Sequence, residues 1–444
     1  MHSSESQGRL LLERIFRAGV DAVDPEVAVR SHARRVGSAL HVRDAVYMLD
    51  DFERVFLIGA GKASAPMAKA LEELLGERLT RGLIVVKYGH TLPLKRTESI
   101  EAGHPIPDSL GLAGAERILR LLDACTEDDL VICALSGGAS ALLPAPVPLL
   151  NLRQKQTTTQ LLLECGATIG EINTIRKHLS RSKGGGVARA AHPATVISLI
   201  LSDVIGDCPG VIASGPTVPD ESRFAECVDV VERYGIASSL PKPVWRFLQE
   251  GAAGLHPETP KTGDPIFSRV HNVIVGNNRA ALIAAKDCAE SLGLRTLLLT
   301  SCIEGAAREV GQVLASIGKE VCLSGYPLAP PLCVLAGGET TVTLRGQGKG
   351  GRCQELALST AITLDGWSRI SLLAAGTDGT DGPTDAAGAY VDGTTCARAR
   401  ASGLHPANSL SQNDSYHFFQ RLGDLLIIGP TRTNVMDLMC LLIQ

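Results

Sequence analysis

The alternation of short apolar runs with helical patterns is the feature that most constrains how this chain can fold. Runs rich in valine, isoleucine and leucine, such as "RVFLIG", "GLIVVK" and "DLVICAL", alternate with alanine-rich stretches such as "ASAPMAKALEELLG". In the alanine-rich stretches the apolar residues recur at helical spacing. Continuous apolar strands that alternate with helices are typical of mainly parallel sheets covered on both faces. The pattern therefore predicts an α/β fold.

The same pattern continues through both halves of the chain. Further predicted strands are "TVISLIL", "NVIVG", "RTLLLT", "LCVLAG", "TTVTL", "ISLLAA" and "DLLIIG". The run "TTVTL" alternates polar with apolar residues, which predicts some antiparallel pairing in the second half. With 444 residues the chain is too long for one ordinary core. Residues 238–265 are dense in proline and glycine, so we expect two domains, 1–245 and 246–444.

Charge and composition favour an ordinary soluble protein that acts on a small molecule. The net charge of -4 provides no general attraction to nucleic acid or to an anionic membrane. No apolar run approaches the ~18 residues of a membrane span, and the first residues lack the apolar centre of a signal peptide. The 12 cysteines include no CxxC pair that would suggest zinc or dithiol chemistry. Most of them lie in apolar or helical stretches, as expected for small buried residues in a reducing compartment. We expect a cytoplasmic protein, either a monomer or a homodimer.

Two small-residue turns follow predicted strands in the first half. In "GAGKAS", Gly59 and Gly61 allow a tight turn, with Lys62 and Ser64 at the start of a helix. The N–H groups of such a helix can bind an anion, although an ordinary strand–helix turn explains the pattern equally well. Ser64 occupies the third glycine position of a dinucleotide fingerprint, which argues against a nicotinamide cofactor. Lys87, at the end of the next strand, replaces the acid of an NAD site and argues the same way.

The second turn, "SGGAS", suits a phosphate or carboxylate held by backbone amides. Its members Ser136, Gly137 and Gly138 follow "LVICAL" directly. A serine nucleophile is less favoured, because no G-x-S-x-G elbow is present. Further along, "NTIRKHLSRSKGGG" carries five basic residues, and a solvated helix with a glycine cap explains most of them. Arg176 and Lys183 are the candidates for contact with an anion.

Acidic residues follow strands in both halves. Asp203 comes just after "TVISLIL", with Asp207 four residues later, and such acids can bind Mg²⁺ or accept a proton from a substrate hydroxyl. In the second half Asp378 and Asp381 follow "ISLLAA" at a spacing that does not match an EF-hand. Helix caps and Asx turns are alternative explanations for these residues. Near the end, "GDLLIIGPTRTNVMDL" repeats the strand–glycine–helix form.

The stretch "GGETTVTLRGQGKGGRCQE" is unusual in its density of glycine and charge. Its 19 residues hold six glycines and three cations, and they run into a predicted helix. Cations near a helix N-terminus oppose the helix dipole unless an anion sits there. We therefore expect Lys349 and Arg352 to lie beside an anion, with Glu339 as a hydroxyl or metal contact. A surface loop with incidental charges is the alternative.

Taken together, these segments resemble the type II glycerate kinases, the glycerate 2-kinase family with a C-terminal MOFRL domain. The motifs that carry the resemblance span nearly the whole chain in the family's order, and they are "GAGKAS", "EAGHPIPDSLG", "ALSGGASALL", "NTIRKHLSRSKGG", "LSDVIGDCPGVIASGPTVPD", "GGETTVTLRGQGKGGRCQELAL", "AAGTDGTDGPTDAAGAYVD" and "NDSYHFFQRLGDLLIIGPTRTNVMDL". The resemblance implies two three-layer α/β/α domains. The N-terminal domain would be Rossmann-like, and the MOFRL domain would have a mixed sheet.

The same resemblance implies phosphorylation of D-glycerate to 2-phosphoglycerate by ATP, with Mg²⁺, in a cleft between the domains. Lys62, Asp203 and Arg352 would be the catalytic residues. The candidates for contact with substrate or phosphate are Gly59, Gly61, Ser64, Ser136, Gly137, Gly138, Arg176, Lys183, Glu339 and Lys349, and the candidates for Mg²⁺ are Asp203, Asp207, Asp378 and Asp381. Two other functions stay open, an NAD(P)H-dependent hydroxypyruvate reductase and an anion-binding protein without catalysis.

Overall fold

The computed structural model describes residues 2–444, with side chains from residue 7 onward, and the chain forms two compact units. Unit 1 comprises the chain up to Val27 together with Gly276–Gln444, and unit 2 is Ala28–Val275. These units do not coincide with the domains 1–245 and 246–444. The last strand of the unit 2 sheet lies beyond residue 245, and the first helix of the chain packs in unit 1.

Unit 2 is built around a six-stranded sheet with the order β6-β5-β4-β7-β8-β9. The pairs β6/β5, β5/β4, β4/β7 and β7/β8 are all parallel, as the continuous apolar runs predict. The strands are β4 (Arg54–Ala60), β5 (Leu79–Lys87), β6 (Thr97–Ala102), β7 (Asp129–Leu135), β8 (Thr195–Leu201) and β9 (Val270–Gly276). A small antiparallel sheet precedes them, formed by β1 (Ala33–Val36), β2 (Ala39–Val42) and β3 (Ala45–Met48).

Helices cover the unit 2 sheet, and its parallel strands all end at the same edge. Helix α3 packs on β4, β5 and β7, whereas α4 packs on β5 and β6. Side chains from α4, α5 and α8 join Phe56, Ile58 and Val131 of the strands in one apolar core. The helices are α2 (Pro25–His32), α3 (Ser64–Leu75), α4 (Ser109–Leu122), α5 (Ala139–Leu142) and α8 (Gly186–Ala191).

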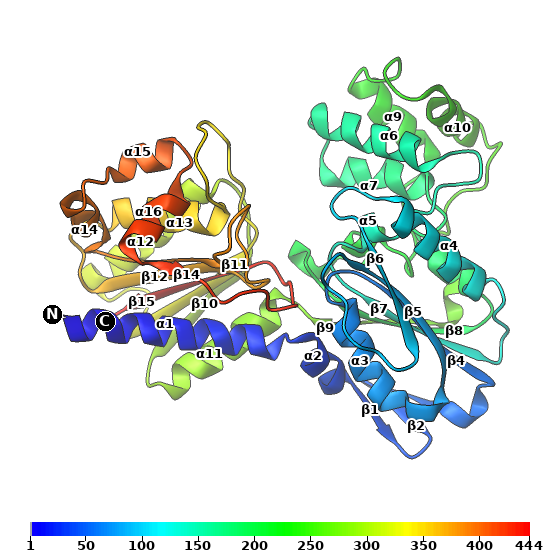
Figure 1. The fold of residues 1–444 in the computed structure, drawn as a ribbon, viewed down its shortest axis with the longest axis horizontal. Coiled ribbons are helices and arrows are strands. Elements are labelled where there is room, and N and C mark those ends of the chain that lie inside the picture. Colours follow the sequence, from blue (N-terminus) through cyan, green and yellow to red (C-terminus); the bar gives the residue numbers. More distant parts are fainter. Residues whose placement is uncertain (1) are drawn as a thin grey trace. The chain divides into compact units, whose positions relative to one another are not determined.

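Four further helices of unit 2 form a cluster with its own apolar core, shown apart from the sheet in Figure 1. They are α6 (Leu152–Glu164), α7 (Ile169–His178), α9 (Phe224–Arg233) and α10 (Lys242–Ala252). Helix α10 shows why the cluster forms: Val244, Phe247, Leu248 and Gly251 recur at helical spacing and are all buried. Helices α6 and α7 each begin with a capping box, which fixes their starting points.

Unit 1 contains a mixed six-stranded sheet with the order β10-β11-β15-β12-β13-β14. Only β10 and β11 pair in parallel, and the other pairs are antiparallel. The strands are β10 (Arg295–Ile303), β11 (Leu332–Gly338), β12 (Ile370–Gly376), β13 (Gly388–Asp392), β14 (Leu425–Leu426) and β15 (Asp437–Ile443). The predicted mixed sheet is thus confirmed.

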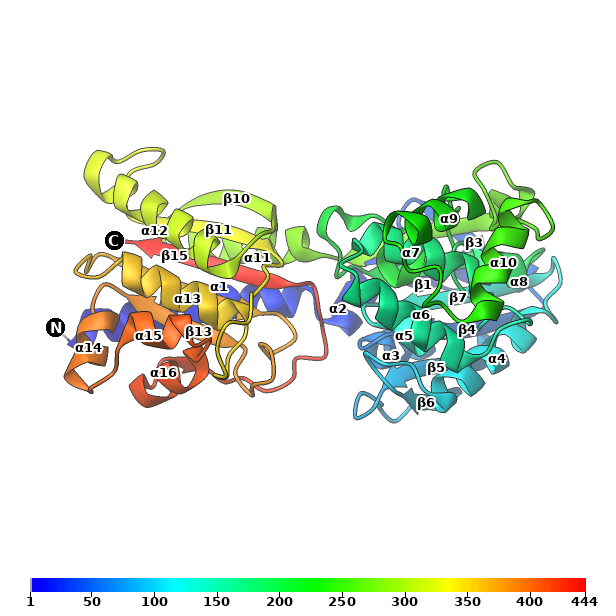
Figure 2. The ribbon, with the colours of Figure 1, turned by 90° about the horizontal axis from the view of Figure 1, so that it is seen from above.

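Helices cover both faces of this sheet, as Figures 1 and 2 show. Helices α1 and α11 pack together on one face, and α12 and α13 pack together on the other. The helices are α1 (His2–Ala22), α11 (Asn278–Ser291), α12 (Ala307–Ser324), α13 (Arg352–Thr363), α14 (Thr395–Ala401), α15 (Pro406–Ser411) and α16 (Ser415–Leu422). Across residues 2–444, no helix has the length and apolar character needed to cross a membrane.

Three predictions for the second half were wrong in detail. Residues 340–344 form no strand, and only Thr341 makes an isolated bridge, to Ala306. In "DLLIIG" only Leu425–Leu426 is a strand. The residues after "GPTRTNV" form strand β15 rather than a helix, and β15 lies between β11 and β12 in the sheet. A short apolar run such as "LMCLLI" fits a buried strand or a helix equally well, so its periodicity cannot decide.

Candidate functional site

The two predicted turns of unit 2 lie side by side at the carboxyl ends of β4 and β7. The backbone N–H of Lys62 donates to the carbonyl of Gly137 at 2.9 Å, and the N–H of Ala63 donates to Ser136 Oγ at 3.0 Å. The Ser64 hydroxyl donates to the carbonyl of Ala134 at 2.8 Å. Ser64 and Ser136 have no exposed surface, and the hydroxyl of each forms a hydrogen bond with backbone of the same unit.

The glycines of these turns are required by close approach of neighbouring groups. Gly59 faces the carbonyl of Ala134, where a Cβ would come within 2.7 Å. Gly61 has a φ of +135°, and a Cβ there would overlap Ser136. Both glycines therefore let β4 and its turn pack tightly on β7. The packing within the chain explains them without a ligand.

Gly137 and Gly138 differ, because chemically active side chains surround them. A Cβ on Gly137 would overlap the Asp203 carboxylate. On Gly138, whose φ is +87°, a Cβ would lie 3.0 Å from the His104 ring and 3.5 Å from Lys62 Cγ. The residues Lys62, His104, Gly137, Gly138 and Asp203 are called the strand-end site below. It places a carboxylate, a lysine and an imidazole around one short stretch of backbone, in which Gly137 is buried and Gly138 is partly exposed.

His104 is a member of this site that the sequence reasoning missed. Burial, together with the nearby charges of Lys62, Lys87 and His90, lowers the pKa of His104 to about 4. Its imidazole is therefore neutral near pH 7 and can exchange hydrogen bonds without adding charge. His104 follows the end of β6, so the rule that ligands bind at strand ends could have identified it.

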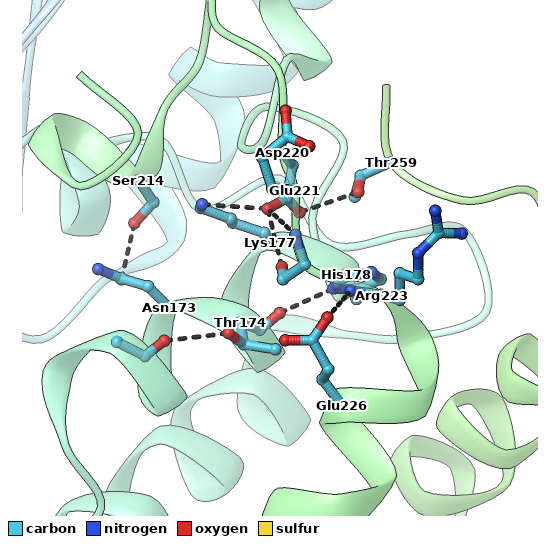
Figure 3. Close-up of polar contacts among 12 residues, drawn as sticks. Asn173, Thr174, Lys177, His178, Ser214, Asp220, Glu221, Arg223, Glu226 and Thr259 are labelled. Carbon is cyan, nitrogen blue, oxygen red and sulfur yellow. Dashed lines mark hydrogen bonds and ion pairs between the residues drawn. The ribbon is translucent and has the colours of Figure 1, made fainter. Parts of the chain in front are cut away.

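The loop after Asp203 has a strained backbone. Asp207, Ala213 and Ser214 have φ values of +54°, +55° and +60°, in the left-handed region that side chains other than glycine seldom adopt. Hydrogen bonds hold this loop in place: the Ser214 hydroxyl lies 2.6 Å from that of Ser140 and donates to Asn173 Oδ1 at 3.1 Å (Figure 3). Strain of this kind persists where surrounding contacts impose it, often at functional sites.

Lys177 and His178, two of the basic residues of this stretch, each contact a carboxylate within unit 2. Lys177 Nζ lies 3.1 Å from Asp220 Oδ1, and Asp220 also accepts a hydrogen bond from Thr259 (Figure 3). His178 Nε2 lies 3.0 Å from the carboxylate of Glu258. The interpretation of "RKHLSRSK" as a simply solvated helix is thus incomplete, since Lys177 and His178 join α7 to other segments.

Arg176 and Lys183 are different, because neither forms an ion pair with a carboxylate among the side chains of residues 7–444. Lys183 is only 2% exposed, and its ammonium donates to the carbonyl of Ser140 at 2.7 Å. A third basic residue, Lys155 of α6, is also buried in this part of unit 2. Its charge contributes to lowering the pKa of Lys183. The sequence reasoning missed Lys155 because nothing in the local pattern separates it from a surface lysine.

In unit 1 the predicted catalytic Arg352 is held by two carboxylates. Its Nε and Nη2 donate to the two oxygens of Asp437 at 2.6 and 2.9 Å, and its Nη1 donates to Glu339 at 2.7 Å. Burial alone would lower the pKa of Arg352, but the hydrogen bonds and charge of Asp437 raise it overall. Asp437, at the start of β15, was not among the predicted residues. Arg352 is therefore a permanently charged and firmly oriented group.

The glycine-rich stretch before Arg352 packs against its own chain. A Cβ on Gly346, Gly348 or Gly350 would overlap residues 412–415. The N–H groups of residues 345 and 346 donate to Asn413 Oδ1, and the Lys349 ammonium lies 4.3 Å from the centre of the Tyr416 ring. The glycines and Lys349 are thus explained by contacts within unit 1, and the anion that the sequence suggested is not needed to account for them.

The predicted acidic residues of unit 1 also have partners within the chain. The two oxygens of Asp381 accept from the N–H groups of Cys353 and Gln354, and burial and the charge of Asp437 raise its pKa to about 7. Asp378 Oδ1 accepts from the N–H and hydroxyl of Thr380. In residues 7–444 no group of three or more His, Cys, Asp or Glu side chains could hold a metal ion. Asp381 acts here as a cap for the first turn of α13.

In the stretch "GPTRTN", where the sequence predicts the start of a helix, Thr431, Thr433 and Asn434 bind backbone groups of unit 1. The hydroxyl of Thr431 donates to the carbonyl of Thr377, and that of Thr433 donates to the carbonyl of Val23, each at 2.6 Å. Asn434 Oδ1 accepts from the N–H of Met436. Since β15 rather than a helix follows, these side chains fix the entry into the central strand instead of capping a helix.

Comparisons with known proteins agree across the full length of the chain. Residues 11–249 match the model of a domain of unknown function, DUF4147, and residues 332–437 match the MOFRL family. A D-glycerate 2-kinase from Thermotoga maritima is 42% identical over 439 residues, covering 99% of each chain. A protein from Agrobacterium vitis with the provisional name hydroxypyruvate reductase is 41% identical, covering 99% of this chain and 95% of its own. A crystal structure of glycerate kinase from Thermotoga maritima superposes with a TM-score of 0.88, covering 99% of this chain and 100% of its own.

Proposed function

Because the chain belongs to the glycerate kinase family with DUF4147 and MOFRL domains, we propose that it transfers a phosphoryl group from ATP to D-glycerate, yielding 2-phosphoglycerate and ADP. The observation that carries the proposal is the arrangement of the strand-end site. Asp203 and Lys62 come from the ends of different strands and meet at the backbone of Gly137 and Gly138. Phosphoryl transfer needs this combination of a group that orients a hydroxyl and a cation that stabilises phosphoryl charge.

Each side chain of the strand-end site has a chemical role in this proposal. The Asp203 carboxylate accepts the proton of the 2-hydroxyl and directs that oxygen toward the phosphorus. The Lys62 ammonium stabilises the charge on the transferred phosphoryl oxygens. His104, neutral near pH 7, offers a hydrogen bond at the same place without changing the net charge. The backbone of Gly137 and Gly138 lets the reacting groups approach without steric hindrance.

Arg352 remains a predicted stabiliser of the transferred group. A guanidinium has five N–H donors, and three of them are used on Asp437 and Glu339. Two N–H donors are therefore left for a phosphoryl oxygen. The carboxylates keep the guanidinium charged and fixed in orientation, so little reorganisation is needed when an anion arrives.

Magnesium would be held by acidic residues of unit 2. Mg²⁺ usually takes one or two carboxylates together with phosphate oxygens and water, so it does not need a cluster of three protein ligands. Asp203 and Asp207, which follow β8, would supply the carboxylates. When bound, Mg²⁺ would neutralise charge on the nucleotide's phosphates.

A second candidate function is reduction of hydroxypyruvate, favoured by the name of the Agrobacterium vitis relative. The residues of this chain argue against it. Ser64 replaces the third glycine of a dinucleotide fingerprint, and Lys87 stands at the end of β5, where an NAD site would have an acid. A third candidate function is anion binding without catalysis. A protein of this kind would bind the anion but would not turn over substrate.

One pair of assays separates these functions. In the first, the protein is mixed with ATP, Mg²⁺ and D-glycerate, and ADP is measured against a sample without glycerate. In the second, it is mixed with hydroxypyruvate and NADH, and the loss of NADH absorbance is followed. The proposal predicts glycerate-dependent ADP and constant NADH absorbance. Loss of NADH without ADP formation would establish the reductase, and inactivity in both assays together with glycerate binding would establish the binding protein.

A further inference from the structure

Three basic residues of unit 2, two of them buried, lie close enough to affect one another's charge and have no carboxylate partner among residues 7–444. Lys155 lies on the inner face of α6 and is 8% exposed, and Lys183 is 2% exposed. Arg176, on α7, is partly exposed. Among residues 7–444, no Asp or Glu side chain forms an ion pair with any of these three. The residues Lys155, Arg176 and Lys183 are called the cation group below.

The ammonium of Lys155 is the least satisfied member of the cation group. Its Nζ is inaccessible to solvent and has no hydrogen-bond partner in the described part of the chain. Burial, together with the charges of Arg176 and Arg181, lowers the pKa of Lys155 to about 7. Burial and the charges of Arg176 and Lys155 likewise lower the pKa of Lys183. Burying like charges without a counterion is unfavourable, so the lysines tend to lose a proton unless an anion joins them and keeps them charged.

Hydrogen bonds connect the cation group to the strand-end site. Lys183 Nζ donates to the carbonyl of Ser140, which ends the turn that begins with Ser136 and Gly137. The Ser140 hydroxyl contacts Ser214, and Ser214 in turn donates to Asn173, three residues before Arg176 on α7 (Figure 3). Gly137, in the same turn, packs against the Asp203 carboxylate. Lys183 of the cation group and Asp203 therefore both contact residues 136–140, the turn after β7 and the start of α5.

We propose that Lys155, Arg176 and Lys183 bind the carboxylate of glycerate, next to the turn that borders Asp203. This inference rests on the proposed function, because it assigns the part of the site that recognises the substrate. Arg176 forms the partly exposed side of the site, and the two lysines form its floor. The carboxylate supplies the counterion that the protein itself does not provide.

The enclosure of the two lysines favours a small carboxylate over a nucleotide's phosphates. A triphosphate is long, multiply charged and strongly hydrated, whereas the carboxylate of a three-carbon acid is compact. The position of the cation group also bears on which hydroxyl reacts. The 2-hydroxyl is attached to the carbon next to the carboxylate, and the 3-hydroxyl is one carbon further away. A carboxylate anchored beside the turn thus presents the 2-hydroxyl to Asp203 first.

The test uses the full-length protein and three variants, Lys155→Met, Arg176→Gln and Arg153→Gln. Arg153 is an exposed cation on the same helix as Lys155 and serves as the matched control. Binding of D-glycerate and of ATP is measured separately by titration calorimetry, and the thermal midpoint is measured with and without D-glycerate. Losing one charged hydrogen bond should weaken D-glycerate binding about 10- to 100-fold in Lys155→Met and Arg176→Gln, with ATP binding unchanged. Arg153→Gln should bind both ligands as the parent does.

Stability gives a second readout that does not depend on catalysis. Lys155→Met replaces a buried ammonium without a partner by an apolar chain of similar length, so without ligand its thermal midpoint should rise by about 2–4 °C. The same variant should lose the stabilisation that D-glycerate gives to the parent. A variant that is destabilised without ligand and still binds D-glycerate normally would show a structural role for Lys155 and overturn the proposal.

The remaining outcomes are equally decisive. Weaker ATP binding with normal D-glycerate binding would show that the cation group holds a phosphate, and unchanged binding of both ligands would show that it holds no anion of the reaction. Either result contradicts the assignment of the cation group to the carboxylate of glycerate. The proposed function would still hold in both cases, provided that the parent enzyme forms ADP with D-glycerate. Failure of the parent to form ADP with D-glycerate would instead contradict the proposed function itself.

Discussion

The glycine-rich turns of the two units are similar in sequence but different in chemistry. In unit 2, Gly137 and Gly138 are surrounded by Asp203, His104 and Lys62, and the cation group, with its two buried lysines, has no carboxylate partner in residues 7–444. In unit 1, Gly346, Gly348 and Gly350 pack against residues 412–415. There Arg352 is bound by two carboxylates, and Lys349 lies over the ring of Tyr416.

This comparison shows that glycine and charge along a sequence do not by themselves identify an anion site. What separates Arg352 of unit 1 from the cation group of unit 2 is whether carboxylates of the chain itself neutralise these cations. Arg352 and Arg308 of unit 1 have their carboxylates, Asp437 and Glu355, within 3 Å. The cation group of unit 2 has no such carboxylate. A buried charge without a partner is energetically costly, so it favours binding of an anionic ligand far more than a paired charge does. Substrate recognition is therefore assigned to unit 2.

The largest effect should follow from removing the carboxylate of the strand-end site. Asp203→Asn should lower turnover about 10³-fold, because the amide cannot accept the proton of the substrate hydroxyl. Steady-state kinetics with ATP and D-glycerate measures this loss. The control is Asp229→Asn, an exposed aspartate of α9, which should keep the parent's rate. A rate for Asp203→Asn within a few-fold of the parent would exclude Asp203 from the reaction.

The next effect tests how much of the role of Arg352 is structural. Arg352→Ala should lower turnover ~100-fold, as expected for loss of one preorganised cation. It also leaves Asp437, which is 1% exposed, without its partner, so unfolding in denaturant should show a loss of ~3 kcal/mol. The double variant Arg352→Ala/Asp437→Asn should recover most of that stability but none of the turnover. Recovery of both would mean that Arg352 acts only by stabilising unit 1.

The smallest effect concerns the glycines of unit 1. Gly351→Ala would place a Cβ against Asp381, so it should destabilise unit 1 by ~1–3 kcal/mol without changing the KM for D-glycerate. Gly170→Ala is the control, since a Cβ there would have only Thr168 Oγ1 nearby, at 3.9 Å. Denaturant unfolding and steady-state kinetics measure the two quantities. A raised KM with unchanged stability would place D-glycerate at the glycine-rich stretch of unit 1. That result would contradict the assignment of substrate recognition to unit 2.

Much of the fold could be predicted from the sequence, because the parallel strands of unit 2 are continuous apolar runs bounded by turns. The predicted runs at 129–135 and 195–201 coincide with β7 and β8. The central strand β15 of unit 1 was missed, since an apolar run of this length fits a strand or a helix. Its place between β11 and β12 depends on pairings with segments about 60 to 110 residues away, which no local pattern reveals.

The site residues that directly follow strands could be predicted from the sequence. The residues whose role depends on partners far away along the chain could not. Lys62, Gly137 and Asp203 follow strands, and the structure brings them together. Asp437 holds Arg352 from 85 residues away, so its role is invisible until the chain has folded. Lys155 looks like a surface lysine in the sequence, and only the packing of α6 buries it. Burial without a partner is a property of the three-dimensional structure alone.

Hydrogen–deuterium exchange of the full-length protein with and without D-glycerate tests the difference between the units most directly. If unit 2 recognises the substrate, D-glycerate should slow amide exchange in residues 136–142 and 173–185. Residues 345–351, which are already bound to their own chain, should exchange at the same rate in both samples. Slower exchange in residues 345–351, with none in the two segments of unit 2, would contradict this assignment.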